Sequence, residues 1–379
     1  MKAQPPTQIS DPCLRFFQQP KAFIAQASHA DWTLLLQQSR DQALLGSMYA
    51  LCQPQQLLAL LPRAVHDHFW SGFVYAEKQK VTLVQELLEL EQCFAGANYP
   101  CVLVKGCAYR LGLYQFAKGR IFSDIDLLVP AAHFADALAR LQDAGYLEFE
   151  ISDYDRRYYQ RWSHQNPPLT HFLRGAGIDL HHHIFPVSSR EKILVEPLIA
   201  AAEPLAHSMF SLPAPAYLFV HAAVHLFYQE ESHKLVKDLV DLQQLYLEVC
   251  QRQSVTAIVE AAEQCQAQAA VYYALDMLQW LFQLSIPAAE LQALQPFASD
   301  RRRRYIRFLL QQLLQKQAFW HRCAHLLWFI RGHLLKMGPA TLLYHTVAKA
   351  LLQFKLNRKT SKEQQLADEQ TRPQDAGQL

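Results

Sequence analysis

Residues 102–130 read VLVKGCAYRLGLYQFAKGRIFSDIDLLVP, and the fold prediction starts from this stretch. The apolar run 102–104 predicts a buried strand, Gly106 predicts a tight turn, and residues 108–114 predict a helix. A second strand is expected over residues 123–129. This order of strand, turn, helix and strand predicts a sheet with helices packed against it.

The second expected strand carries two acids on an apolar background. Asp124 and Asp126 are two residues apart, so their side chains share one face, about 7 Å apart along the strand. Two such carboxylates need a counter-ion, and Mg²⁺ fits because it takes hard oxygen ligands that it shares with substrate phosphates. A helix that opens after Lys105 and Gly106 presents N–H groups that attract phosphate. The pattern therefore predicts metal-assisted chemistry on a nucleoside triphosphate.

A third acid lies in an expected hairpin. Residues 169–173 and 178–185 predict two strands joined by a tight Gly-Ala-Gly turn, with Asp179 near the start of the second arm. If this arm lies beside the strand of Asp124 and Asp126, three carboxylates converge. A two-metal centre would then use Asp124 and Asp126 as shared ligands. Asp179 would bind the metal that activates an acceptor hydroxyl and would act as the general base.

These motifs resemble a known family. The residues that carry the resemblance are Lys105-Gly106, Tyr114, Arg120, the run Asp124-Ile125-Asp126-Leu127-Leu128-Val129, and Asp179-Leu180-His181. They are similar to the bacterial uncharacterised nucleotidyltransferases of the DNA polymerase β-like superfamily, over about residues 80 to 245. The resemblance implies a small mixed sheet flanked by helices and an NTP cosubstrate with Mg²⁺ or Mn²⁺. It also implies transfer of a nucleoside monophosphate to an acceptor.

The resemblance also implies nucleotide-binding roles around the acids. Lys105 is expected at the triphosphate, although a charge at a strand end is the simpler interpretation, and Gly106 is expected to receive the outer phosphates. Arg120 either steadies phosphate by a bidentate contact or is a loop residue. His181 is expected to orient Asp179 or to meet phosphate. The Gly106-Cys107 pair departs from the Gly-Ser or Gly-Gly of much of the superfamily, so the usual hydroxyl contact to phosphate is missing.

Histidines leave other interpretations open. Asp179, His181 and His183 share a face of the expected strand and could ligate zinc, which would favour a metal-dependent phosphohydrolase. His221 and His225 are four apart on an expected helix, either as a ligand pair or as part of a polar network with Asp238 or Asp241. A third alternative is a non-catalytic binding protein on the same fold.

Composition limits the class of protein. The chain has 379 residues and 51% hydrophobic content, enough for two or three packed units. Eight cysteines without a C-x-x-C spacing indicate reduced thiols rather than a disulfide framework or a zinc site. No signal sequence or apolar run of membrane-spanning length is found, so a cytoplasmic protein without a transmembrane segment is expected.

Charge is distributed unevenly. Residues 301–362 contain fourteen Lys or Arg and no acid, so the rest of a chain of net charge +2 carries −12. This asymmetry predicts an anionic partner: a membrane surface, which would place the protein peripherally at the inner membrane, nucleic acid, or an acidic protein. Trp320, Trp328 and Phe329 would contribute by inserting into the interface or by stacking.

The chain is thus expected to be an α+β protein with a polymerase β-like nucleotidyltransferase core between helical regions. The expected parts are an N-terminal helical region (1–95), the core (96–205), a helical region that completes the site (206–300), a basic helical module (301–356) and a disordered tail (357–379).

Overall fold

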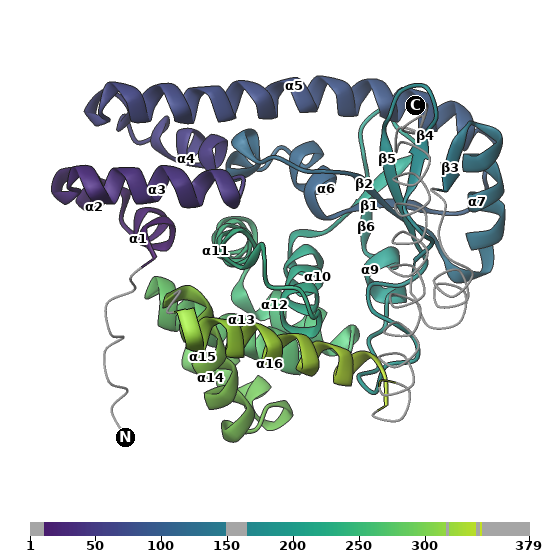
Figure 1. Cartoon of the computed structure of the whole chain (residues 1–379). Helices are drawn as coiled ribbons and strands as arrows, with labels where there is room; N and C mark the ends of the chain where they lie inside the picture. Colours follow the sequence, from purple (N-terminus) through teal and green to yellow (C-terminus); the bar gives the residue numbers. More distant parts are fainter. Residues whose placement is uncertain (1–10, 149–164, 316–317, 339–341, 343–379) are drawn as a thin grey trace, which may run out of the picture.

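The computed structural model describes residues 11–148, 165–315, 318–338 and 342. A seven-stranded sheet with helices on both of its faces forms the part labelled β1 to β6 in Figure 1. The expected α+β class is confirmed. The tail expected to be disordered, 357–379, lies outside the described residues.

The sheet is mixed, in the order β3-β4-β5-β2-β1-β7-β6. β1 pairs antiparallel with β2 and parallel with β7, and β2 pairs parallel with β5. β4 and β5 form the expected hairpin. The strands are β1 (Cys101–Val104), β2 (Ile125–Leu128), β3 (Tyr146–Glu148), β4 (Leu169–His171), β5 (Gly177–His181), β6 (Ala202–Pro204) and β7 (Phe210–Pro213).

Helices precede the sheet, as expected from the sequence. They are α1 (Pro12–Gln18), α2 (Pro20–Gln26), α3 (His29–Asp41), α4 (Leu45–Cys52), the 3₁₀ turn η1 (Leu58–Leu60) and α5 (Arg63–Cys93). Pro54 and Pro62 lie between α4 and α5. The 31-residue α5 runs from the small N-terminal helices to the sheet and joins the two parts (Figure 1).

Short helices fill the connections of the sheet, and a helical layer follows it. The connections hold α6 (Lys105–Leu111), η2 (Gln115–Gly119), η3 (Ala131–His133), α7 (Phe134–Asp143) and α9 (Glu196–Ala200). The later layer holds α10 (Pro215–Tyr228), α11 (Leu235–Arg252), α12 (Val255–Gln264), α13 (Gln268–Phe282), α14 (Ala288–Leu294), η4 (Gln295–Phe297), α15 (Asp300–Gln315) and α16 (Ala318–Lys336). None of the helices within the described ranges is long and apolar enough to cross a membrane.

Alternation along the strands divides the core into two clusters. Leu103, Ile125 and Leu127 face α5 and α7, where they pack with residues such as Leu87 and Leu141. Val102, Val104 and Leu128 face the other way, toward the helices that follow the sheet. Because side chains on a strand alternate between faces, Asp126 must lie on the side of Leu128 and therefore toward α10 and α11.

The structure corrects three details of the sequence interpretation. Asp124 lies one residue before β2 rather than within it. Gly106 does not form a turn, because α6 begins directly at Lys105 and Gly106 lies in its first turn. Trp328 is fully buried, so the expectation that it contacts an external partner is wrong, whereas Trp320 and Phe329 are about half exposed.

Three glycines hold the N-terminal helices against the core. Gly46 of α4 and Gly72 of α5 lie backbone to backbone, and Gly119, at the end of η2, lies against the carbonyl of Gly46. A Cβ added at any of the three would overlap backbone atoms of a neighbouring segment. The approach of these segments therefore requires residues without a side chain.

We expect Gly119→Ala to lower the free energy of unfolding by about 3 kcal/mol, because the new methyl group overlaps a backbone that cannot move aside locally. Urea unfolding of the two proteins measures the change. Gly338→Ala is the control, since no atom lies within 4 Å of the position of its Cβ. Equal stability of the two variants would show that the glycine contact is not required.

Candidate active site

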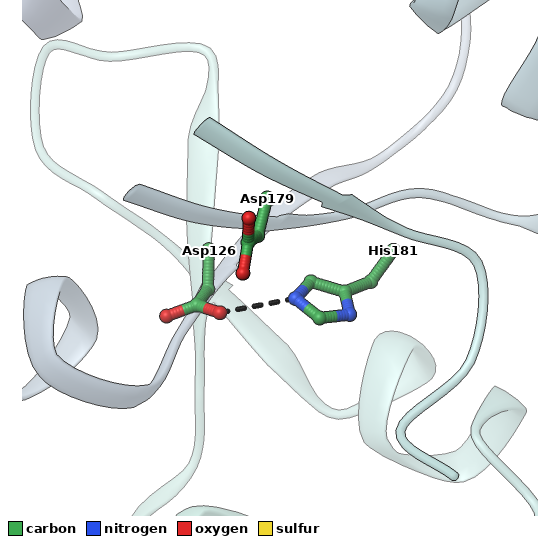
Figure 2. A group of neighbouring side chains, drawn as sticks. All are labelled: Asp126, Asp179 and His181. Carbon is green, nitrogen blue, oxygen red and sulfur yellow. Dashed lines mark hydrogen bonds and ion pairs between the residues drawn. The ribbon is translucent and has the colours of Figure 1, made fainter. Parts of the chain in front are cut away.

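Parallel pairing of β2 with β5 creates the site. Asp126 lies directly opposite Asp179 in the register, and Leu128 lies opposite His181. The expected adjacency of the two strands is thus confirmed. Ligand atoms of Asp126, Asp179 and His181 lie within 4.8 Å of one another. Figure 2 shows the two carboxylates and the imidazole gathered on one face of these strands.

Asp126 is the most strongly bonded of the acids. It is 3% exposed, and its Oδ1 accepts hydrogen bonds from Lys105 Nζ at 2.6 Å and from His181 Nε2 at 3.0 Å. Burial opposes its ionisation, but the charge of Lys105 and the bond from His181 outweigh that effect and lower the pKa of Asp126 below its usual range. Asp126 is therefore a carboxylate whose charge is held in place by two donors.

His181 acts here as a donor. Burial lowers the pKa of its imidazole, so the ring is neutral. A carboxylate only accepts hydrogen bonds, so the proton of the neutral ring must lie on Nε2, which faces Asp126. A nitrogen that carries this proton cannot bind a metal ion at the same time. His181 orients Asp126 in this arrangement, whereas the sequence interpretation had it orient Asp179 or meet phosphate.

Lys105 supplies the cation of the cluster from an unusual backbone position. Its φ angle is +53°, in the left-handed region that residues with side chains rarely adopt. Burial would lower the pKa of its ammonium group, yet the charge and hydrogen bond of Asp126, together with the charges of Asp179 and Asp124, raise it. The structure thus places Lys105 on the acids, where it offsets part of their charge.

Asp179 differs from Asp126 in its bonding. Among the described residues it has no hydrogen-bond or ion-pair partner. Burial, and then the charges of Asp126 and Asp124, raise the pKa of Asp179 to about 7. Its carboxyl group is therefore the one in the cluster that no other described residue binds by a hydrogen bond or an ion pair.

Asp124 lies outside the cluster of three ligand atoms, at the entrance to it. Ser123 Oγ donates a hydrogen bond of 2.8 Å to its Oδ1. Asp124, Asp126 and Lys105 line a cavity of about 190 Å³, hereafter the inner cavity. Its opposite wall comes from α10, α11 and the loop between them, and includes His225, Lys234 and Lys237.

Arg120 lies in the same wall, but its charge is largely engaged. Its Nε and Nη2 donate to the two oxygens of Asp241 at 2.9 and 2.7 Å, and its guanidinium lies over the ring of Tyr109. A Cβ added to Gly106 would overlap this guanidinium. The close approach of Arg120, rather than a turn, therefore explains why glycine occupies this position. Arg120 therefore ties the sheet to α11.

Each residue from Gly119 to Phe122 contacts a helix outside this segment. Beside the contacts of Gly119 and Arg120, the carbonyl of Ile121 accepts from Lys237 Nζ at 2.8 Å. The carbonyl of Phe122 accepts from Gln79 Nε2 at 2.9 Å, and the N–H of Phe122 donates to Gln79 Oε1 at 3.2 Å. This segment leads directly to Asp124, so α5 and α11 together fix the entrance of the site.

Cys107 points away from the inner cavity. Its thiol donates to the carbonyl of Val104 at 3.0 Å and lies 3.9 Å from that of Asp126. The thiol is fully buried, and burial raises its pKa to about 12. The residue that replaces the usual hydroxyl or glycine thus attaches α6 to β1 and β2.

The donor set fits a hard divalent ion. Asp126 and Asp179 present carboxylate oxygens side by side, with Asp124 near them, and Mg²⁺ or Mn²⁺ binds through such oxygens. Both hydrogen bonds of Asp126 fall on Oδ1, which leaves Oδ2 for an ion. The zinc set Asp179, His181 and His183 is not assembled, because His183 follows β5 and its Nδ1 accepts from the N–H of Phe185.

Several residues of the site were not expected from the sequence. Gln79, Lys237 and Asp241 were not expected to bind the segment from Gly119 to Phe122. The ion pair between Lys105 and Asp126 was not expected either. Lys237 and Asp241 belong to a segment whose acids were expected in a polar network with His221 and His225. Asp241 instead binds Arg120. The polar residues on an otherwise apolar helix were the available signal, but the pattern did not identify their partner.

The fold and the paired acids together define a mixed-sheet protein with a candidate site for a divalent ion at Asp126 and Asp179. A family model described as "Uncharacterised nucleotidyltransferase" matches residues 28–283, from the start of α3 to the end of α13. The chain belongs to this nucleotidyltransferase family. Comparison with curated proteins and with solved structures gave no match. The matched range is wider than residues 80 to 245 and stops before α14, α15 and α16.

Lys105→Ala tests the ion pair. We expect it to lower the free energy of unfolding of the metal-free protein by about 3 kcal/mol, because buried Asp126 then keeps its charge without a cation. Added Mn²⁺ should stabilise this variant more than the wild-type protein, since the ion replaces the missing charge. Thermal unfolding with and without Mn²⁺ measures both effects. Lys118→Ala, at an exposed position, is the control, and an identical response of the two variants would contradict the assignment.

Asp238, in the wall of the inner cavity, gives a pH test. Burial and then the charge of Asp241 raise the pKa of Asp238 to about 7. Its stabilising contribution is therefore complete below about pH 4 and is lost as pH rises through 7. We expect Asp238→Asn, which mimics the protonated form, to be more stable than the wild-type chain at pH 8, with the difference shrinking at pH 5. Urea unfolding at both pH values measures it, and a difference independent of pH would refute the assignment.

Proposed function

We propose that the chain has a polymerase β-like core, of the kind found in bacterial nucleotidyltransferases, and transfers a nucleoside monophosphate from an NTP to an acceptor hydroxyl, with release of pyrophosphate. Asp124, Asp126 and Asp179 are the proposed metal ligands. The observation that carries this proposal is the register that places Asp179 beside Asp126, whose side chain lines a cavity together with four cations. Family membership supports the reaction class.

The inner cavity is the proposed triphosphate site. Lys105, Arg120, Lys234 and Lys237 contribute positive charge to its wall. A triphosphate needs several such cations because its charge is otherwise costly to remove from water. Lys105 would exchange its contact with Asp126 for the phosphates when a metal ion takes over the acids. Arg120 keeps Asp241 as its partner and serves mainly to position the wall.

The reaction forms one bond and breaks one bond. The acceptor oxygen attacks the α-phosphorus, the bond from that phosphorus to the bridging oxygen breaks, and pyrophosphate leaves. The proton of the acceptor hydroxyl passes to Asp179, the acid without a bonded partner among the described residues. A divalent ion bound at the acids would supply charge neutralisation for the triphosphate and for the attacking oxygen. Asp126, oriented by its hydrogen bond from His181, would fix the position of that ion.

The basic C-terminal module remains a separate prediction. Arg303 and Arg307 bind the buried Asp276, so part of the arginine cluster is compensated inside the chain. Arg301, Arg302 and Arg304 are exposed and remain for an anionic partner. Binding to a membrane surface or to nucleic acid, the cytoplasmic location and the boundaries of the five parts stay predictions.

Two variants separate binding from chemistry. Asp126→Ala should abolish the divalent-metal dependence of NTP binding, because it removes a ligand whose charge the ion must offset. Asp179→Asn should lower kcat by about 100-fold or more while it changes NTP affinity less, because its role falls in the acceptor step. Calorimetric titration with each NTP, with and without Mg²⁺, and initial rates of pyrophosphate release measure these effects.

Asp143→Asn, on α7, is the matched acid control and should behave as wild type. Tight metal-dependent NTP binding by Asp126→Ala would remove the metal-site proposal. Full activity of Asp179→Asn would remove the assignment of the base.

A further inference from the structure

A second cavity meets the inner cavity at Ser123 and Asp124. It has a volume of about 610 Å³ and is hereafter the outer cavity. One wall is a face of α5, and the other is the turn between β4 and β5, from Arg174 to Gly177. Phe122, Ser123 and Asp124 line both cavities. A ligand in the outer cavity can thus reach Asp124, the acid that lines both cavities.

Two residues in the lining of the outer cavity, Glu86 and Arg174, form an ion pair with each other. Glu86 of α5 is 4% exposed, and Arg174 binds both of its oxygens at 2.9 Å. The hydroxyl of Tyr146 also donates to Glu86. The charges of Glu86 and Arg174 therefore offset each other, and neither is free to bind a charged ligand.

The charges that remain around the outer cavity do not suit an anion. Its lining holds two cations, Lys78 and Arg174, and three acids, Glu86, Glu89 and Asp124, so the acids are in excess. Arg174 binds Glu86 and also lies 4.0 Å from Glu89. A nucleic-acid end needs a wall of unpaired cations, because each phosphate contact replaces a counterion. The inner cavity has four cations beside four acids in its lining, so it is richer in positive charge than this wall.

The polar groups of α5 suit hydroxyls instead. Tyr75, Thr82, Gln85 and Glu89 are exposed and lie on the face of α5 that lines the outer cavity. A phenol, an amide and a carboxylate offer donors and acceptors to neighbouring hydroxyl groups, and the ring of Tyr75 offers an apolar surface to C–H groups. The volume lies within the range of small-molecule sites, of about 300 to 1,000 Å³.

We propose that the outer cavity binds the acceptor, and that this acceptor is a small hydroxyl-rich molecule without negative charge, of the sugar or cyclitol class. The inference rests on the proposed nucleotidyl transfer and adds to it the substrate class and its binding residues. The acceptor hydroxyl approaches Asp179 past Asp124, and the triphosphate occupies the inner cavity. Gln85 and Glu89 are specificity-determining residues in this arrangement.

The first experiment identifies the acceptor class. The full chain is incubated with α-labelled NTPs and Mn²⁺, and with hexoses, N-acetylhexosamines, inositol, a hexose 6-phosphate, a single-stranded RNA oligonucleotide or a serine-containing peptide. We expect label on at least one uncharged sugar or cyclitol, with at least a tenfold preference over the sugar phosphate. Label confined to the RNA, the peptide or the sugar phosphate overturns the inference.

The second experiment assigns the binding site. Gln85→Ala and Glu89→Ala should each raise the KM for the labelled acceptor about tenfold, the usual loss for a hydrogen bond to a polar ligand. NTP affinity by calorimetry and the slow hydrolysis of NTP by water should change less than twofold. Glu91→Ala, on the same helix but away from the cavity, is the control and should match wild type.

The outcomes distinguish the two proposals. Weakened NTP binding in Gln85→Ala and Glu89→Ala would indicate that the outer cavity binds the nucleoside of the NTP. That result would overturn the inference about the acceptor but would not contradict the proposed nucleotidyl transfer. An unchanged acceptor KM in both variants overturns the inference in the same way. If the wild-type chain shows no metal-dependent NTP binding, both the proposed function and this inference fail.

Discussion

Hydrogen-bonded pairing of β2 with β5 is the constraint on which the site depends, because it sets Asp126 beside Asp179 in register. Two neighbouring carboxylates on a buried surface repel each other, and the chain offsets this repulsion with Lys105 and with a neutral His181. The same arrangement that is costly in the metal-free protein is the one that a divalent ion would stabilise. A shift of the register by one residue would turn the acids to opposite faces.

The position of Asp124 depends on distant parts of the chain. Asp124 follows a segment that Gly46, Gln79, Lys237 and Asp241 hold in place. These contacts come from α4, α5 and α11, and all three helices lie within the range that the family model matches. The helices before and after the sheet therefore belong to the structure of the site. The segment that they hold, from Phe122 to Asp124, lines both the inner and the outer cavity.

The sequence predicted those features that depend on local pattern. Periodicity and turn residues located β1, β2 and the hairpin of β4 and β5. From the spacing of Asp124 and Asp126 the sequence predicted that these two acids share a face, and Asp179 was expected to join them if its strand lay beside theirs. It did not predict the partners of charged side chains, because Arg120 and Asp241 are 121 residues apart and meet only through helix packing. It assigned Gly106 to a turn, since a sequence does not show which guanidinium will approach a glycine. Trp328 was expected at a surface because one helical pattern fits both an interfacial helix and a packed one.

The central claim is that Asp126 and Asp179 hold a divalent ion that receives an NTP. Anomalous diffraction from crystals of the full chain, grown with Mn²⁺ and a non-hydrolysable NTP analogue, tests it most directly. The account predicts a manganese peak bonded to oxygens of Asp126 and Asp179, with the triphosphate in the inner cavity and Lys105 Nζ moved from Asp126 to a phosphate. A triphosphate bound elsewhere, with no manganese at these acids and Lys105 still on Asp126, would contradict it.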